Sequence, residues 1–256
     1  MGLAELTDRG RFINKSLLNF ITIHDVVFDV GCGIGYFDLI ISRAKSVIGL
    51  DIALSALKQG KKNLSKAEEE LHWPNASNID FIMGSAEALP CNSDSIDKVL
   101  CLAVLEHVLD DKKVVKEILR VLKPGGKMLI VVPIEEKFMP LSTSWISQKL
   151  GLYKRSETHL RHYTLDKIKS LLRNCEIVST EFAPFFFASY AALFARILVK
   201  VYRFSESKTI VTSFIKSIAR ILLKMYDIDE KIGSAMRGWF ILVVAKKKKS
   251  MCRTVI

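Results

Sequence analysis

The sequence predicts an α/β fold in which a doubly wound, mostly parallel sheet carries helices on both faces. Two observations support this prediction. Short apolar segments typical of buried strands alternate with segments typical of helices through most of the chain. In addition, the stretch "VFDVGCGIGYFDL" places three glycines at every second position, where the first strand gives way to a helix. Such alternation is typical of right-handed βαβ units.

The individual elements follow in order along the chain. Apolar segments predict strands at 25–31, 46–53, 79–85, 95–103 and 127–133. The intervening segments predict helices at 36–44, 54–71 and 112–126, the last of them closed by Pro and Gly. A helix at 165–174 and two closing strands at 176–183 and 238–247 complete the pattern. The residues at 184–237, between the closing strands, have a helical pattern and are expected to form an insert within a single domain of residues 1–256.

Composition restricts the environment of the protein. The five cysteines lie scattered with no CxxC pair, which favours neither a zinc site nor a disulfide framework. A reducing, intracellular compartment is therefore expected. The first residues carry charges throughout and lack the apolar core of a secretory signal. We expect a cytoplasmic protein, with a peripheral position at the inner face of the membrane as a further hypothesis.

The glycine stretch indicates a ligand site at the carboxyl end of the first strand, because ligands of doubly wound sheets bind there. A dinucleotide fingerprint would need glycine at position 36, where this chain has Tyr36, and no Lys-Ser/Thr follows to form a phosphate loop. Asp51 ends the second predicted strand and can accept hydrogen bonds from both hydroxyls of a ribose. A helix N-cap is the alternative role for Asp51. Ser85 and Ala86 follow the third strand, where a hydroxyl and a backbone N–H could meet an adenine edge.

These segments resemble the class I S-adenosylmethionine-dependent methyltransferases, and within them the branch of quinone-biosynthesis and related small-molecule methyltransferases. The resemblance covers roughly residues 11–183 and the last strand. It is carried by six ordered segments: "VFDVGCGIGYF", "GLDIA", "GSAEALP", "DKVLCLAVLEHV", "ILRVLKPGGKMLIVVP" and "HLRHYTLDKIKSLL". It implies a Rossmann-like, seven-stranded sheet whose last strand is antiparallel, with the cofactor S-adenosyl-L-methionine lying across the strand ends.

The resemblance also implies roles for individual residues. The methionine part of the cofactor would be surrounded by Asp29, Gly31, Cys32, Gly33 and Gly35. The ribose would be bound by Asp51 and the adenine by Ile52, with Ser85, Ala86 and Glu87 along the base and Leu102 and Ala103 lining the donor pocket. This chain has Ser85 where the family often has Asp, which predicts weaker cofactor binding rather than none.

Methyl transfer from a sulfonium is an in-line displacement, so orientation of the two reactants supplies much of the acceleration. A base is needed only for a hydroxyl or an acidic carbon acceptor. His107 and His162 are the candidate catalytic residues, although His107 could equally be a structural residue. Glu106 and His107, with His162 as a conceivable third ligand, fall short of a convincing metal site, so no metal is expected.

The net charge of +11 is localised. Residues 185–226 contribute +6, and the tail from Lys246 contributes +5. Two segments, 186–204 and 209–226, show basic and apolar residues on separate helical faces, as helices lying in an anionic membrane surface require. A lid over the acceptor pocket is the alternative. The sequence therefore predicts methyl transfer to a small or lipid acceptor, for example a quinone precursor, near a membrane. A soluble small-molecule or protein methyltransferase, a non-catalytic cofactor-binding protein and a nucleic-acid-binding protein remain alternatives, the last disfavoured because no basic patch appears in the predicted core.

Overall fold

The computed structural model describes residues 8–73, 75–134, 160–182 and 240–248. The chain forms two compact units, and the unit that comprises residues 13–134, 159–181 and 241–256 contains the sheet described here. The expected insert at 184–237, with its two basic segments 186–204 and 209–226, lies outside the described residues.

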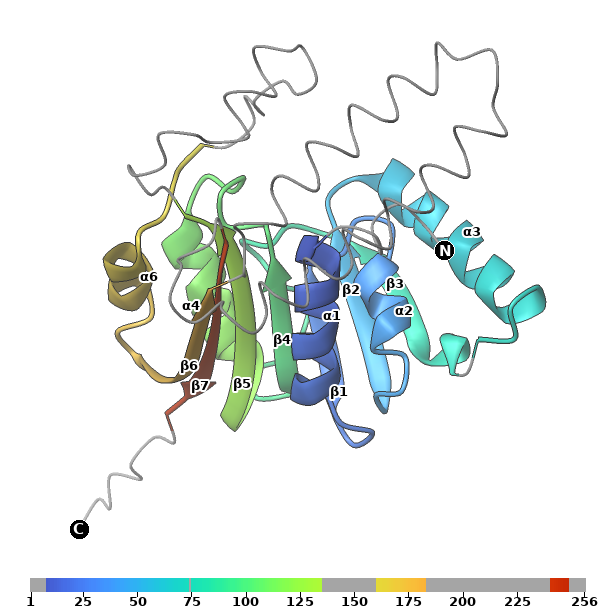
Figure 1. Ribbon diagram of the computed structural model, residues 1–256, viewed down its shortest axis with the longest axis horizontal. Coiled ribbons are helices and arrows are strands. Elements are labelled where there is room, and N and C mark those ends of the chain that lie inside the picture. The colour runs from blue at the N-terminus through green and yellow to red at the C-terminus, as the bar shows by residue number, and fades with distance from the viewer. Residues whose placement is uncertain (1–7, 74, 135–159, 183–239, 249–256) are drawn as a thin grey trace, which may run out of the picture. The chain divides into compact units, whose positions relative to one another are not determined.

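A seven-stranded sheet forms the centre of this unit, as predicted (Figure 1). The strands are β1 (Val26–Val30), β2 (Ser46–Asp51), β3 (Ile79–Met83), β4 (Ile96–Leu102), β5 (Leu122–Pro133), β6 (Cys175–Phe182) and β7 (Phe240–Lys247). Their order is β3-β2-β1-β4-β5-β7-β6, with parallel pairing from β3 through β5. The sheet is mostly parallel and ends in one antiparallel hairpin. Its central strands are almost fully buried, with Phe28, Leu100 and Leu129 at 0% exposure.

Five α-helices and one 3₁₀ turn accompany the strands in the described part of the chain. The helices are α1 (Asp8–Phe20), α2 (Tyr36–Ile40), α3 (Leu54–Glu69), α4 (Asp111–Val121) and α6 (Leu165–Leu171), and the 3₁₀ turn is η2 (Ala76–Asn78). Helix α3 contacts β2 and β3, α2 contacts β2, and α4 contacts β5. None of the described helices has both the length and the apolar character that crossing a bilayer requires.

Helix α1 was not predicted. Its buried face consists of Ile13 and Leu17, followed by Ile21 just beyond the helix, all at 0–1% exposure. Because they are four residues apart, their side chains lie on one stripe of a helix. The charged residues at 8–15 drew the sequence analysis away from this periodicity.

Two predicted helices are shorter in the structure. Helix α2 ends at Ile40 instead of residue 44. Helix α4 ends at Val121, because Leu122 has extended backbone angles and pairs with Ile96 of β4. The proline at position 124 also disfavours a helical conformation for Lys123. The strand β5 thus begins before the Pro-Gly-Gly stop that was predicted to close the helix.

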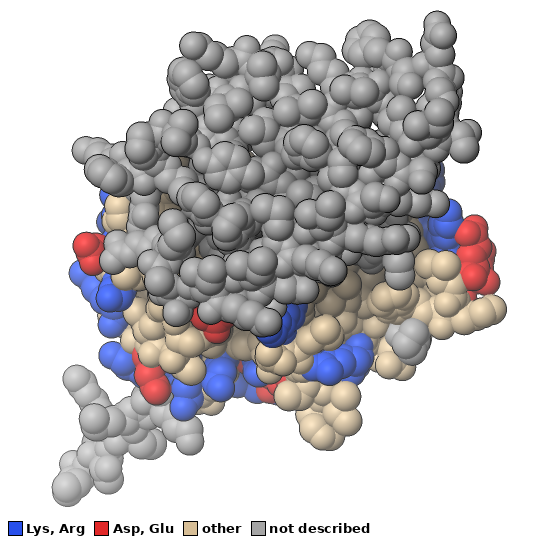
Figure 2. Space-filling view, viewed as in Figure 1, with Lys and Arg blue, Asp and Glu red and all other residues tan. Residues whose placement is uncertain are grey.

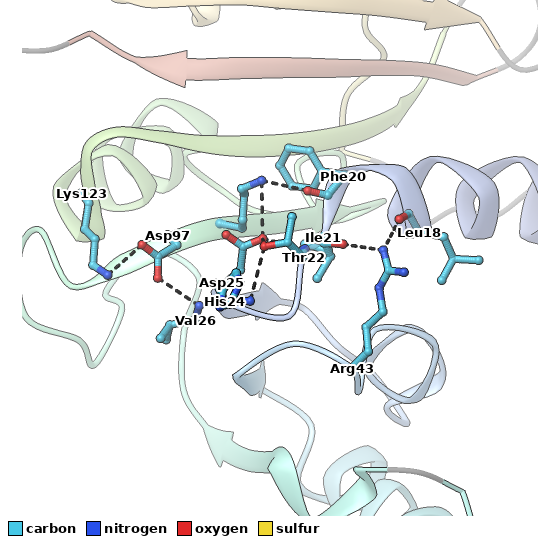
Figure 3. A network of polar contacts seen from close by, with 11 residues as sticks. Leu18, Phe20, Ile21, Thr22, His24, Asp25, Val26, Arg43, Asp97 and Lys123 are labelled. Atoms are coloured by element: carbon cyan, nitrogen blue, oxygen red, sulfur yellow. Dashed lines mark hydrogen bonds and ion pairs between the residues drawn. The ribbon is translucent and has the colours of Figure 1, made fainter.

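The amino ends of the central strands are fixed by a polar network (Figure 3). Lys123 forms an ion pair of 2.7 Å with Asp97, whose other oxygen accepts a hydrogen bond from the Val26 N–H. Arg43 donates to the carbonyl oxygens of Leu18 and Ile21 at the end of α1. These contacts join the segments at the amino ends of the strands, which is the edge of the sheet opposite the glycine loop.

Acidic and basic side chains are interspersed on the visible described surface (Figure 2). Lys98 pairs with Asp25, and Lys247 pairs with Asp94 at 2.6 Å. Such pairing agrees with a charge excess that the sequence places mainly in residues 185–226 and in the tail.

Candidate active site

The carboxyl edge of the sheet brings together the loops that follow β1, β2, β3 and β4. The loop after β1, which contains the three glycines, is bonded to the end of β2. The N–H groups of Gly31 and Cys32 both donate to the Leu50 carbonyl oxygen, at 2.7 and 3.0 Å. The Gly33 N–H donates to Asp51 Oδ2 at 2.8 Å. The candidate cofactor residues of the first and second strand ends therefore lie together, as the sequence predicted.

The glycines of this loop are required for two different reasons. All three have positive φ, between +58° and +77°. A Cβ at Gly31 would lie 2.4 Å from Val104 Cγ2, and one at Gly35 would lie 2.4 Å from Phe81 Cζ. A Cβ at Gly33 would meet nothing within 4 Å. The sequence argument that glycine leaves room for a ligand therefore applies to Gly33, whereas the other two make room for the protein's own side chains.

Asp51 is held by two backbone amides. Its Oδ2 accepts from Gly33 and its Oδ1 accepts from the Ala53 N–H, both at 2.8 Å. The N-cap of α3 is Ala53, so Asp51 is not the cap residue that the alternative interpretation required. An ionised carboxylate can accept about four hydrogen bonds. Two acceptor positions of a fixed carboxylate thus remain for a diol such as a ribose.

Apolar side chains are exposed beside Asp51. Ile52 is 76% exposed and Met83, at the end of β3, is 62% exposed. Large apolar side chains exposed together at a strand edge mark a binding surface, and a flat heteroaromatic base is a suitable ligand for them. Ser85 Oγ accepts from the Glu87 N–H at 3.2 Å, and its hydroxyl proton can donate to a ligand.

The Glu87 carboxylate is bound by the start of the next helix. Its Oε1 accepts from the Asp110 N–H at 3.1 Å, and its Oε2 lies 4.0 Å from Lys113 Nζ. Glu87 thereby connects the loop after β3 to the start of α4. Its carboxylate is engaged by the chain itself, which leaves its backbone and its neighbour Ala86 for contact with a base.

The loop after β4 packs against the glycine loop. Leu102 is buried with 7% exposure, and Ala103 has the left-handed φ of +58°, with its N–H donating to the Val131 carbonyl oxygen at 2.8 Å. The next side chain, Val104, lies against Gly31. Ala103 and Val104 therefore form the wall of the site on the side of β4.

A buried carboxyl pair under the glycine loop was missed in part by the sequence analysis. Asp29 was expected at the site, but Asp38 on α2 was not; the two side chains have 2% and 0% exposure. Burial, and next the charge of Asp38, raises the pKa of Asp29, and burial raises the pKa of Asp38 to about 7. Both carboxyls are buried and the charge of Asp38 opposes ionisation of Asp29, so the pair keeps a proton to a higher pH than an exposed aspartate does. The one sequence signal for this pair was the charged Asp38 among the apolar residues of α2.

The two candidate histidines lie on loops that contact each other. His107 is exposed in the loop after β4, and His162 is half-buried between β5 and α6. The Leu160 N–H donates to the Glu106 carbonyl oxygen at 2.8 Å, next to His107. The structure thus brings together two segments that are more than fifty residues apart in the sequence. His159, beside Leu160, lies outside the described residues.

Comparison with known proteins shows what this region is similar to. Residues 28–130, which contain the glycine loop, Asp51 and the loop after β4, match the family model described as methyltransferase domain. This part of the chain is therefore similar to methyltransferase domains, whose methyl donor is S-adenosylmethionine.

Relatives of this methyltransferase domain include quinone-biosynthesis enzymes. The chain is 36% identical over 122 residues to the demethylmenaquinone methyltransferase of Renibacterium salmoninarum, which is 46% of this chain and 45% of that protein. It is 35% identical over 124 residues to the ubiquinone biosynthesis O-methyltransferase of Idiomarina loihiensis, 45% of this chain and 48% of that protein. The chain thus matches about half the length of these relatives.

The fold is shared with solved methyltransferases. The geranyl diphosphate C-methyltransferase of Streptomyces coelicolor A3(2), solved with Mg²⁺, geranyl diphosphate and S-adenosyl-L-homocysteine, aligns with a TM-score of 0.58. The sequence identity is 15%, and the alignment covers 93% of this chain and 77% of that one. At this identity the similarity concerns the fold.

The residues of the methyltransferase domain fit the cofactor. Open space beside Gly33 can accept the methionine part against the main chain. The fixed carboxylate of Asp51 suits the ribose diol, and the exposed Ile52 and Met83 suit the base. These residues suit an adenosyl compound. They do not suit a pyrophosphate bound in a phosphate loop, because the glycine loop has no lysine.

Proposed function

We propose that this protein transfers the methyl group of S-adenosylmethionine to a lipophilic acceptor, such as a quinone precursor or another lipid, at a membrane surface. The observation that carries the methyl-transfer part is the fixed arrangement of Gly33 and Asp51 within a methyltransferase domain. The cofactor supplies an activated methyl group when it is bound. The protein has to hold donor and acceptor in line and to exclude water.

The residues of the site divide this work. Asp51 and Ile52 hold the adenosyl end, so that the methionine end lies along the glycine loop near Ala103 and Val104. The acceptor then approaches from the side of the loops that carry His107 and His162. Either histidine can take the proton of a hydroxyl or an acidic carbon acceptor.

Two features support a lipophilic acceptor. The relatives described above are named for demethylmenaquinone and for ubiquinone biosynthesis. Leu109 and Leu160 are 81% and 55% exposed on the two loops that carry the candidate histidines. These leucines offer apolar surface beside the reacting groups, where an isoprenoid or acyl chain would lie.

The charge distribution supports a membrane surface as the location. The basic segments at 186–204 and 209–226 combine cationic and apolar residues. Each cation near an anionic leaflet adds about 1 kcal/mol of binding free energy. We therefore propose a cytoplasmic protein that binds peripherally to the anionic inner face of the membrane.

The direct test is incubation of the full chain with methyl-labelled S-adenosylmethionine and a total lipid extract. Label is expected in a lipid that can be isolated and identified by mass spectrometry. Label found only in water-soluble compounds or proteins would instead support a methyltransferase with a non-lipid acceptor. Binding of S-adenosylhomocysteine without turnover of any acceptor would indicate a non-catalytic protein.

Liposome flotation tests the membrane part separately. The full chain is expected to float with vesicles containing phosphatidylglycerol and not with neutral phosphatidylcholine vesicles. Replacing Lys216, Arg220 and Lys224 by Gln should weaken this binding roughly hundred-fold. The matched control replaces Lys58, Lys61 and Lys62 on α3, which removes the same charge from an exposed surface of the described domain. Equal loss in both variants would contradict a specific role of the basic segment.

A further inference from the structure

The loop that walls the cofactor site on the side of β4 contains a turn, in which the His107 N–H donates to the Val104 carbonyl oxygen at 2.9 Å. Ala103 holds a left-handed conformation that is costly for a residue with a side chain. Partners outside the loop help to keep Val104 against Gly31.

Those partners come from residues 160–163. Arg161 Nη1 donates to the carbonyl oxygens of Leu105 at 3.2 Å and Val108 at 2.7 Å, and Nη2 donates to that of Leu109 at 2.7 Å. Its Nε lies 3.9 Å from Asp111 Oδ2. One guanidinium therefore contacts three backbone carbonyls and a carboxylate at the start of α4.

Tyr163 completes the arrangement. Its hydroxyl lies 2.9 Å from Asp111 Oδ2 and 3.1 Å from the Leu105 carbonyl oxygen. The ring is buried at 3% exposure, and burial together with the hydrogen bond to Asp111 raises the pKa of the hydroxyl. Tyr163 also forms a parallel β-bridge with Ile134, directly after β5. The segment 160–163 is thus anchored to the sheet on one side and to the loop on the other.

We infer that Arg161 and Tyr163 are positioning residues for methyl transfer: they hold the loop after β4 against the glycine loop and so set the shape of the donor site. This inference rests on the donor-binding part of the proposed function. In this inference Arg161 and Tyr163 bind groups of the protein itself and not the methyl acceptor.

The arrangement also fixes the candidate bases. Carbonyl groups on both sides of His107, those of Glu106 and Val108, accept hydrogen bonds from Leu160 and Arg161. His162 lies between the two positioning residues. The same contacts therefore fix the backbone at both histidines relative to the donor site.

Arginine is required for this role because its planar fork presents five donors in fixed directions. Lysine keeps the charge but offers one small ammonium group, which cannot reach three carbonyl oxygens at once. Arg161→Lys should therefore leave at least one of the Val108 and Leu109 carbonyls without its partner, whereas the Leu105 carbonyl keeps Tyr163. Tyr163→Phe removes only the hydroxyl and keeps the buried ring.

The test measures binding of S-adenosylhomocysteine by calorimetry and amide hydrogen exchange of peptides covering residues 103–110, both on the full chain. Arg161→Lys is expected to raise the Kd roughly ten-fold and to speed exchange in the loop by at least as much. Tyr163→Phe should change both in the same direction by a smaller factor. The control is Arg43→Lys, since Arg43 also binds two backbone carbonyls but at the opposite edge of the sheet. The control should lose stability without changing either readout.

A purely structural role predicts a different outcome. Arg161→Lys would then destabilise the fold as Arg43→Lys does, with the Kd within about two-fold of wild type and loop exchange unchanged; this would overturn the inference. If Arg161→Lys does not fold, the Tyr163→Phe result decides. If the wild-type protein itself binds no S-adenosylhomocysteine, the proposed function fails at donor binding, whereas the exchange data still show whether the loop is held by these residues.

Discussion

The buried carboxyl pair of Asp29 and Asp38 has a measurable consequence for stability. Burial raises the pKa of Asp38 from 3.8 to about 7, and burial raises that of Asp29 as well. The folded protein therefore keeps a proton that the unfolded chain releases. Stability from this pair is full below about pH 4 and is lost as the pH rises through about 7, which is the reverse of the usual behaviour of a salt-bridged aspartate.

The substitution Asp38→Asn tests this consequence. Asparagine has nearly the same shape, does not titrate, and can donate an amide N–H to the Asp29 carboxylate. One pKa unit corresponds to 1.36 kcal/mol, and about two units of the difference fall between pH 5 and pH 8. The wild type should therefore lose roughly 3 kcal/mol of unfolding free energy relative to the variant over this range. Since the two carboxyls titrate as a pair, the effect does not depend on which of them holds the proton.

Urea unfolding at pH 5, 6, 7 and 8 provides the measurement. The difference in unfolding free energy between variant and wild type should grow with pH and favour the variant at pH 8. The control is Asp80→Asn, at an exposed position on β3. Its unfolding free energy should change with pH in parallel with that of the wild type. If the stability curves of wild type and Asp38→Asn stay parallel from pH 5 to pH 8, the raised pKa of this carboxyl pair is refuted.

Three further predictions concern the glycine loop and Asp51. Gly35→Ala should cost about 3 kcal/mol of unfolding free energy, because its Cβ would meet Phe81 in a left-handed conformation. Gly33→Ala should cost only about 1 kcal/mol but weaken S-adenosylhomocysteine binding about ten-fold, since its Cβ would fill the open space; urea unfolding and calorimetry separate the two effects, and unchanged binding by Gly33→Ala would place the ligand elsewhere. Asp51→Ala should weaken binding of the same compound about hundred-fold through the loss of two hydrogen bonds to a charged group, with Asp80→Ala as a control that binds normally.

The sequence by itself determined the strands, the glycine loop and the position of Asp51. These features depend on local patterns: apolar runs define buried parallel strands, and the chain order of βαβ units places their carboxyl ends at one edge. Helix α1 was missed because its two buried aliphatic positions, Ile13 and Leu17, lie in a stretch that was judged only by its charges. The end of α4 was misplaced because pairing of Leu122 with Ile96, a contact between distant segments, overrode the helical pattern.

Only the tertiary structure decided which polar side chains lose contact with water and which backbone groups they meet. Asp38 is buried because the face of α2 that carries it packs toward β2. Gly49 of β2 leaves room there for the Asp38 carboxylate. Glu87 and Arg161 find their partners 23 and more than 50 residues away in the chain. Desolvation and hydrogen bonding depend on what lies on every side of a group, and this is set by the packing of segments that are remote in sequence rather than by their own pattern.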